Sequence, residues 1–120
     1  MQHFFILNES FDKSVAGDVN LFSTAERLII AVEAIDVRND EYSCFTSEGC
    51  QVTLSAENDY GPVSATVETQ PRHMNEAASI LRSYLCWLAS NGKIDADLAS
   101  IERGSLVELV GLVPRSFVDG

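Results

Sequence analysis

The residues of this chain with the clearest capacity for chemistry are carboxylates and tyrosines in two short segments. They are Asp36, Asp40, Glu41 and Tyr42 in the first segment and Glu57, Asp59 and Tyr60 in the second. Such groups can form the acid and base of a hydrolase, bind a cation, or dock against Lys and Arg of another protein. The calcium-loop pattern D-x-[DN]-x-[DN]-G is absent, and spacing alone does not give the separation that hydrolysis requires. A docking surface, an ordinary solvated surface and a catalytic pair therefore stay open.

The histidines and cysteines show no arrangement that indicates a metal site or an activated nucleophile. His3 starts an apolar run, His73 precedes a helix pattern, and neither lies in a motif. The cysteines Cys44, Cys50 and Cys86 are odd in number and lack metal-type spacing. Nucleotide-binding, hydrolase and zinc-protease motifs are also missing. We expect no metal, no cofactor and no enzymatic activity, with a small enzyme that uses a cysteine or the carboxylates as an alternative.

The charge balance narrows the class of partner. The 120 residues include 18 Asp and Glu against 8 Lys and Arg, which gives a formal net charge of -10. Nucleic acids and anionic membranes are bound through clustered basic residues, so neither is expected as a direct partner. An acidic surface favours a basic protein partner, or serves solubility alone. The length fits a single domain over residues 1–120.

The sequence predicts a cytoplasmic protein. Its N-terminus lacks a basic region, and the apolar run Phe4–Leu7 is too short for a signal peptide. Apolar stretches fall short of the about 20 residues that span a membrane. The three cysteines show no disulfide pattern, as in a reducing compartment.

A β-hairpin is expected between the two acidic segments and should position them. Residues 42–47 and 50–57 alternate as strands around a two-residue turn. Because the strands are antiparallel, segments 36–41 and 57–59 should meet at one end of the sheet. Glu48 should lie at the opposite end.

The hairpin register predicts which side chains share a face. With Gly49 supplying the positive φ of the turn, Phe45 pairs with Val52. The apolar face then holds Phe45, Cys50, Val52, Leu54 and Ala56. Cys44 falls on the polar face, directed away from Cys50, and this argues against a disulfide.

The other elements complete an α+β pattern. Ser23 and Glu26 form a capping-box pattern that should start a helix over 24–36. The remaining predicted elements are a strand at 3–7, a connection over 8–22, a strand from 63 that Pro71 ends, a helix over 74–91, a short helix from an Asp95 cap through Arg103, and a helix over 106–112, with a strand as its alternative. This order indicates an antiparallel β-meander of three to four strands with helices packed on one face.

The stretch from Ser23 to Tyr42 combines a helix pattern with an Ile-Asp-Val-x-x-x-Glu-Tyr step, and a hairpin around Glu48 and Gly49 follows. This combination resembles small bacterial immunity proteins encoded beside polymorphic or contact-dependent growth-inhibition toxins. The resemblance implies a small, cytoplasmic, often acidic protein that blocks a cognate toxin domain, commonly a nuclease with a basic active site. That family has no shared catalytic residues, so the resemblance assigns no role to any position.

Charge and resemblance together favour an immunity protein that binds and neutralises a basic, nuclease-type toxin. The two acidic segments would form the contact, with carboxylates that speed association and tyrosines that supply buried anchors. The first alternative is a phage- or plasmid-encoded inhibitor that imitates nucleic-acid charge, and the second is the small enzyme. The oligomeric state and the toxin's activity stay open.

Overall fold

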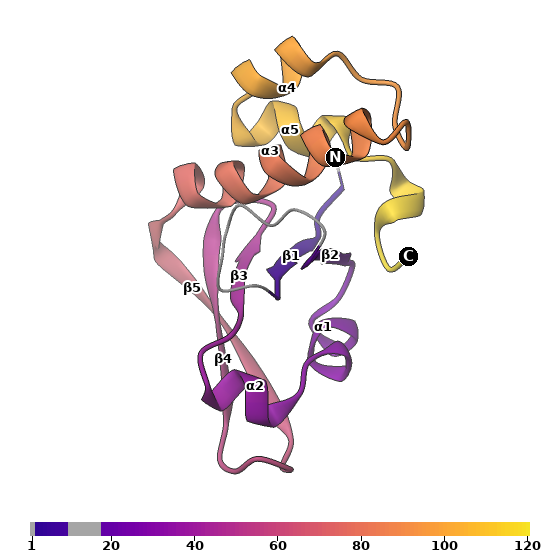
Figure 1. Ribbon diagram of the computed structural model, residues 1–120. Helices are drawn as coiled ribbons and strands as arrows, with labels where there is room; N and C mark the ends of the chain where they lie inside the picture. The colour runs from indigo at the N-terminus through magenta and orange to yellow at the C-terminus, as the bar shows by residue number, and fades with distance from the viewer. Residues whose placement is uncertain (1, 10–17) are drawn as a thin grey trace.

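Short apolar runs form the strands of a five-stranded antiparallel sheet. A computed structural model describes residues 2–9 and 18–120. The strands are β1 (Phe5–Asn8), β2 (Val19–Phe22), β3 (Ser43–Thr46), β4 (Cys50–Ala56) and β5 (Val63–Arg72). They lie in the order β2-β1-β3-β4-β5 (Figure 1). β1 is therefore an interior strand, paired with both β2 and β3, and β5 lies at an edge.

Three helices that follow the sheet build the larger part of the core. They are α3 (Met74–Ser90), α4 (Leu98–Arg103) and α5 (Leu106–Leu112), followed by a 3₁₀ turn, η2 (Arg115–Phe117). Leu81 and Leu85 of α3 and Leu109 of α5 are fully buried in one cluster with Ile6 and Phe45 of the sheet. Figure 1 shows α3 lying between the sheet and α4. Burial of one such leucine stabilises the fold by about 1.5–3 kcal/mol before ordering costs.

Two short helices form a second, smaller cluster with the sheet. α1 (Ala25–Ala31) and α2 (Ala34–Arg38) contribute to a cluster of Leu7, Leu28, Val32, Val37, Cys44 and Val52. Successive side chains of a strand point to opposite faces, so Ile6 enters the larger cluster and Leu7 the smaller one. The predicted α+β class, with helices packed against an antiparallel sheet, is confirmed. The structure adds a fifth strand and helices against the second face.

The predicted continuous helix over 24–36 is wrong, because the chain forms two helices there. Val32 (φ -101°, ψ 152°) and Glu33 (φ -102°, ψ 134°) are extended and separate α1 from α2. The break turns the residues that follow, so Val37 is buried whereas Ile35 is 40% exposed. A single apolar stripe over both helices does not fit this geometry.

The cap of α1 is one residue later than predicted. The Thr24 hydroxyl accepts the Arg27 N–H, which satisfies a donor that the first helical turn leaves free. The Ser23 backbone N–H and hydroxyl instead donate to the carboxylate of Asp119. Two adjacent hydroxyl residues can both cap, and the distant aspartate decides between them.

The predicted hairpin register is wrong by one residue. Residues 47–49 connect β3 to β4, and Phe45 pairs with Gln51 rather than with Val52. A shift of one residue exchanges the faces of a strand. Phe45 therefore packs in the larger cluster, and Cys44, predicted on the polar face, is buried with Val52 in the smaller one.

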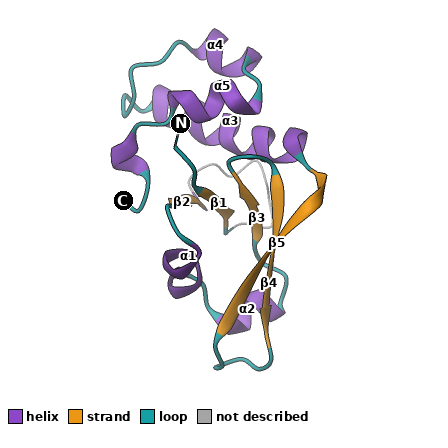
Figure 2. Cartoon of the chain, turned by 180° about the vertical axis from the view of Figure 1, so that it is seen from behind, coloured by secondary structure: helices purple, strands orange, loops and turns teal. Residues whose placement is uncertain are grey.

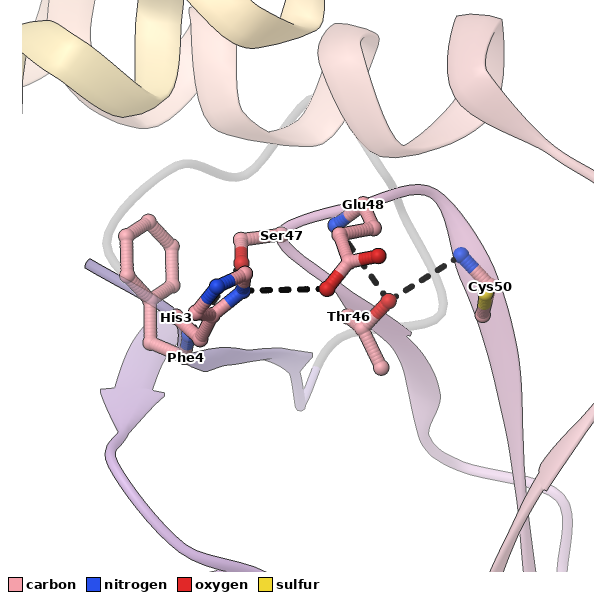
Figure 3. A network of polar contacts seen from close by, with 6 residues as sticks. All are labelled: His3, Phe4, Thr46, Ser47, Glu48 and Cys50. Carbon is pink, nitrogen blue, oxygen red and sulfur yellow. Dashed lines mark hydrogen bonds and ion pairs between the residues drawn. The ribbon is translucent and has the colours of Figure 1, made fainter. Parts of the chain in front are cut away.

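The three-residue turn explains this shift. Gly49 has a φ of 88°, and its N–H donates to the Thr46 carbonyl at 2.9 Å. The Thr46 hydroxyl accepts the N–H groups of Glu48 and Cys50 (Figure 3). The side chain of Thr46 thus organises a longer turn than the two-residue loop that glycine alone suggested.

The N-terminal and edge strands also differ from prediction. β1 begins at Phe5 rather than residue 3, and β2 lies within the predicted connection over 8–22, of which residues 10–17 are outside the described part. β5 continues through Pro71 to Arg72, so the predicted end at Pro71 is wrong. An edge strand tolerates proline because an outward N–H is not needed for the ladder.

The C-terminal half follows the predictions closely. α3 matches the helix expected over 74–91, and Ser105 and Glu108 form a complete capping box at the start of α5. Residues 106–112 are therefore helical rather than a strand. α4 is capped by Asp97 instead of Asp95. In the described ranges no helix has the length and apolarity to cross a membrane.

Candidate acidic interface

Tyr42 lies at the centre of the candidate site, between α2 and the start of β3. Its hydroxyl oxygen accepts the Glu33 backbone N–H at 3.2 Å and donates to Asp36 Oδ2 at 3.4 Å. Glu33 is the N-cap residue of α2, without a side-chain cap, and Asp36 lies in the first turn. One hydroxyl therefore provides a hydrogen-bond acceptor for an otherwise unpaired N–H at the start of α2. It also links that helix to the strand after it.

Carboxylates gather around Tyr42, and the pKa values of two of them are raised. The group consists of Glu9, Asp18, Glu33, Asp36 and Glu41, here called the acidic cluster. Partial burial raises the pKa of Glu9, and the charges of Asp18 and Asp36 raise it further. A hydrogen bond with the Asp36 side chain raises the pKa of Glu41, and the charges of Asp36 and Glu33 add to this. Nearby negative charges thus add to the preference of Glu9 and Glu41 for the protonated form.

The same surroundings keep the Tyr42 hydroxyl protonated. Burial raises the pKa of Tyr42, and the negative charges of Asp36, Glu9 and Glu33 raise it further, against an opposing hydrogen bond from the Glu33 backbone. A neutral phenol can donate to Asp36, whereas a phenolate could only accept. The tyrosine is therefore a fixed donor within the acidic cluster.

Three members of the acidic cluster were missed from the sequence: Glu9, Asp18 and Glu33. In the β1–β3 ladder Asn8 pairs with Ser43, so the next residue, Glu9, reaches Tyr42. The Glu9 N–H donates to the Asp18 carbonyl at 3.0 Å and brings that residue to the same end of the sheet. A carboxylate directly after an apolar strand was the available indication, but the pairing of β1 with β3 is not local in sequence.

The second predicted segment lies on the turn between β4 and β5. Arg38 Nη1 lies 2.8 Å from Asp59 Oδ1, so α2 and this turn meet, as predicted for segments 36–41 and 57–59. Tyr60 is 96% exposed at the tip, and Glu57 is also exposed. Figure 1 shows this turn projecting beyond α2.

The structure therefore divides the predicted contact residues into two groups. Asp36, Glu41 and Tyr42 meet directly in the acidic cluster, whereas Glu57 and Tyr60 project from the turn. Asp59 belongs to the turn as well, and Arg38 offsets its charge.

Asp40 lies between these groups. Its φ of 57° is unusual for a residue other than glycine, and its side chain is exposed. Asp40, Val37 and Tyr42 line a small hollow of about 120 Å³ against residues 51–54 of β4. Among residues with a side chain, asparagine and aspartate tolerate this backbone conformation best, so the position has a structural reason to hold one of these two.

Glu48 lies at the opposite end of the sheet, as predicted. It forms an ion pair with His3, with Nδ1 and Oε1 3.0 Å apart (Figure 3). The Phe4 N–H donates to the Ser47 hydroxyl beside them. This end places Glu48 beside a histidine and is separate from the acidic cluster.

Burial raises the pKa of two of the three thiols, Cys44 and Cys86. Cys44, Cys50 and Cys86 are free thiols. Burial raises the pKa of Cys44 to about 12, so its thiolate is scarce at neutral pH. His73 Nδ1 lies 3.3 Å from Glu76 at the start of α3. Among the described residues no group of His, Cys, Asp and Glu is arranged to hold a metal ion.

Charge is distributed unevenly along the chain. Twelve of the 18 acidic residues lie in residues 1–68, with three of the 8 basic residues. Within the described part, Lys and Arg form salt bridges from Arg27 to Asp119 and from Arg38 to Asp59, and none reaches the acidic cluster. Comparison with known proteins finds no family model, curated protein or solved structure that matches the chain significantly.

Proposed function

We propose that this chain is an immunity-type inhibitor that binds a basic toxin domain, of the nuclease type, through its acidic cluster and the β4–β5 turn. The contact residues would be Glu9, Asp18, Glu33, Asp36, Asp40, Glu41, Tyr42, Glu57, Asp59 and Tyr60. The observation that carries the proposal is the acidic cluster itself, in which burial and then the charges of Asp18 and Asp36 raise the pKa of Glu9, and a hydrogen bond with Asp36 raises that of Glu41. A cationic partner would offset these negative charges.

The chemistry of the site supports binding more than catalysis. The carboxylates surround a protonated tyrosine, Tyr42. Its hydroxyl is held by one hydrogen bond that it accepts from the Glu33 N–H and one that it donates to Asp36. Tyr60 adds a fully exposed aromatic ring, a residue type that supplies much of the energy of protein interfaces once buried. The buried thiol of Cys44 lacks the lowered pKa that a nucleophile needs.

Co-expression with the reading frame next to this chain's gene tests the proposal. We expect that frame to inhibit growth alone and to become harmless when this chain is present, with a stable complex on gel filtration. If the neighbouring product is harmless, or if the chain neither binds nor neutralises it, the proposal fails.

A matched pair of variants tests whether the acidic cluster speeds association with the toxin. Glu33→Gln/Glu41→Gln removes two charges from the cluster, and Asp95→Asn/Glu102→Gln removes the same charge elsewhere. We expect the first variant to associate with the toxin about tenfold more slowly at low salt, and the second to change little. In 1 M salt the two should converge, because the Debye length falls to about 3 Å. If both variants slow association equally at low salt, the rate depends on the net charge of the chain and not on the acidic cluster.

A further inference from the structure

The free edge of the sheet is a second feature suited to binding. β5 is the longest strand and pairs only with β4, with a regular register from Val63 against Ala56 to Glu68 against Gln51. In an antiparallel edge strand, alternate residues direct their N–H and C=O groups away from the sheet. Among the described residues, no hydrogen bond reaches these outward groups of β5.

The opposite edge of the sheet is closed. β2 has only four residues, and Leu21 forms a parallel bridge with Val118 near the C-terminus. The Asp119 N–H also donates to the Leu21 carbonyl at 2.8 Å. Figures 1 and 2 both show the C-terminal segment beside β2. The fold therefore covers one edge with its own chain, whereas the outward backbone groups of β5 have no hydrogen-bond partner among the described residues, although α1 packs against this strand.

The edge of β5 carries few of the features that usually prevent strand addition. Natural proteins protect edges with lysine and other charged side chains, proline, bulges, very short strands or a covering helix. The stretch Val63–Glu68 contains no lysine or proline, and the register shift lies beyond it, between Cys50 and Gln51 of β4. Pro71 also lies beyond it. The residues that can accept another strand are thus Val63–Glu68.

Charge selects the occupant. A second copy would bring another net charge of -10 against this chain, which opposes association. The turn that leads into β5 carries Glu57 and the exposed Tyr60, and Glu68 lies on the strand itself. A segment with Lys and Arg would meet opposite charge at both ends of Val63–Glu68.

We propose that Val63–Glu68 accepts an extended, Lys- or Arg-containing segment of the partner as a sixth strand of the sheet. This inference rests on the proposed function for the biological partner, and adds how that partner is held. Main-chain hydrogen bonds supply affinity in such strand addition, and the flanking charges supply selectivity.

The test uses peptides rather than the toxin, so it stands apart from the co-expression result. A display library of random peptides of about 12 residues is sorted on the full chain. Enriched peptides should alternate basic with β-branched residues. When such a peptide binds, amide exchange should slow at alternate residues of Val63–Glu68 in the native chain, because only the outward N–H groups gain partners.

Two proline variants provide the control. Ala65→Pro and Thr66→Pro remove adjacent N–H groups, of which one points outward and the other toward β4. The variant whose lost N–H points away from β4 should keep its melting temperature. It should bind the peptide at least about tenfold more weakly, a loss of about 1.4 kcal/mol. Glu68→Gln should weaken binding less.

Several results would overturn the inference. These are a library without enrichment, peptides without basic residues, unchanged exchange at Val63–Glu68, and unchanged binding by the folded proline variant. A dimer of the free chain in sedimentation that the proline variant abolishes would assign the edge to a second copy instead. A toxin that is neutralised by an edge-blocked variant would leave the proposed function standing and refute this mode of binding.

Discussion

The hydroxyl of Tyr42 accepts the backbone N–H of Glu33 across the break between α1 and α2, with 3.2 Å between oxygen and nitrogen. The first N–H groups of a helix have no partner within the helix. Tyr42, from a later part of the chain, provides one and also donates to Asp36. One phenol therefore links the start of α2 and Asp36 to the beginning of β3.

Substitution Tyr42→Phe should destabilise the fold by about 1 kcal/mol, since it removes both hydrogen bonds of a half-buried hydroxyl while it keeps the ring. Urea unfolding at neutral pH measures the change. Tyr60→Phe is the matched control, because Tyr60 is 96% exposed and its hydroxyl makes no contact among the described residues. Equal stability of the Tyr42→Phe variant and the native chain would contradict the structural role of this hydroxyl.

Substitution Gly49→Ala should destabilise the fold by more than about 1 kcal/mol. Gly49 has a φ of 88°, and a Cβ there would lie 2.8 Å from Met74 Cγ and 3.1 Å from Met74 Cα. Gly92→Ala is the control, because Gly92 has a φ of 68° but nothing within 4 Å of an added Cβ. Thermal unfolding should show a loss for Gly92→Ala from backbone strain alone, and a larger loss for Gly49→Ala. The reverse order would refute the close approach of the turn to α3.

Substitution Ser105→Ala should cost about 1 kcal/mol, because it removes the capping hydroxyl of α5. The Glu108 N–H would lose its acceptor, while the Ser105 N–H could still donate to the Glu108 carboxylate. Ser79→Ala, at an exposed interior position of α3, should be neutral or slightly stabilising, since alanine has the higher helix propensity. Chemical denaturation of both variants provides the comparison, and a neutral Ser105→Ala would contradict the capping role.

The acidic cluster predicts that stability increases as pH falls from 7 toward about 5. The pKa values of Glu9 and Glu41 are raised in the folded chain, so the folded chain holds protons that the unfolded chain has already lost. Their favourable contribution is complete below the ordinary glutamate pKa and disappears as pH rises through the raised values. The pKa values of Glu108 and Asp119 are lowered by hydrogen bonds from Ser105 and Ser23, so their contribution is lost only in stronger acid.

Melting temperatures across this pH range measure the effect in the native chain and in Glu9→Gln/Glu41→Gln. The variant should be the more stable of the two at pH 7 and should gain less on acidification. An identical pH profile for both would show that folding does not raise the pKa values of Glu9 and Glu41.

Local patterns predicted the C-terminal half well, because its elements depend on near neighbours. The capping box of Ser105 and Glu108 involves residues three apart, and the periodicity of α3 continues over many turns. The N-terminal half depended on distant partners. Asp119 binds Ser23 from 96 residues away, and Thr24 then caps α1.

The same contrast explains the candidate site. Asp36, Glu41 and Tyr42 are close in sequence, so their meeting could be predicted. Glu9 joins them only because β1 pairs with β3, which no short-range pattern determines. The register of the hairpin was missed because the Thr46 hydroxyl, rather than glycine alone, sets the length of the turn.

The sheet separates two hydrophobic clusters that share no residue, and this gives the molecule two units of unequal robustness. The smaller cluster lies under α1 and α2, beneath the acidic cluster, and Leu7 enters it while its neighbour Ile6 supports the larger one. Local opening of the smaller unit exposes less apolar surface than global unfolding and therefore costs less free energy. A partner bound at the acidic end would then slow amide exchange there far more than it would raise the cooperative melting temperature. The surface proposed for recognition is thus also the part of the fold whose fluctuations a partner would suppress most.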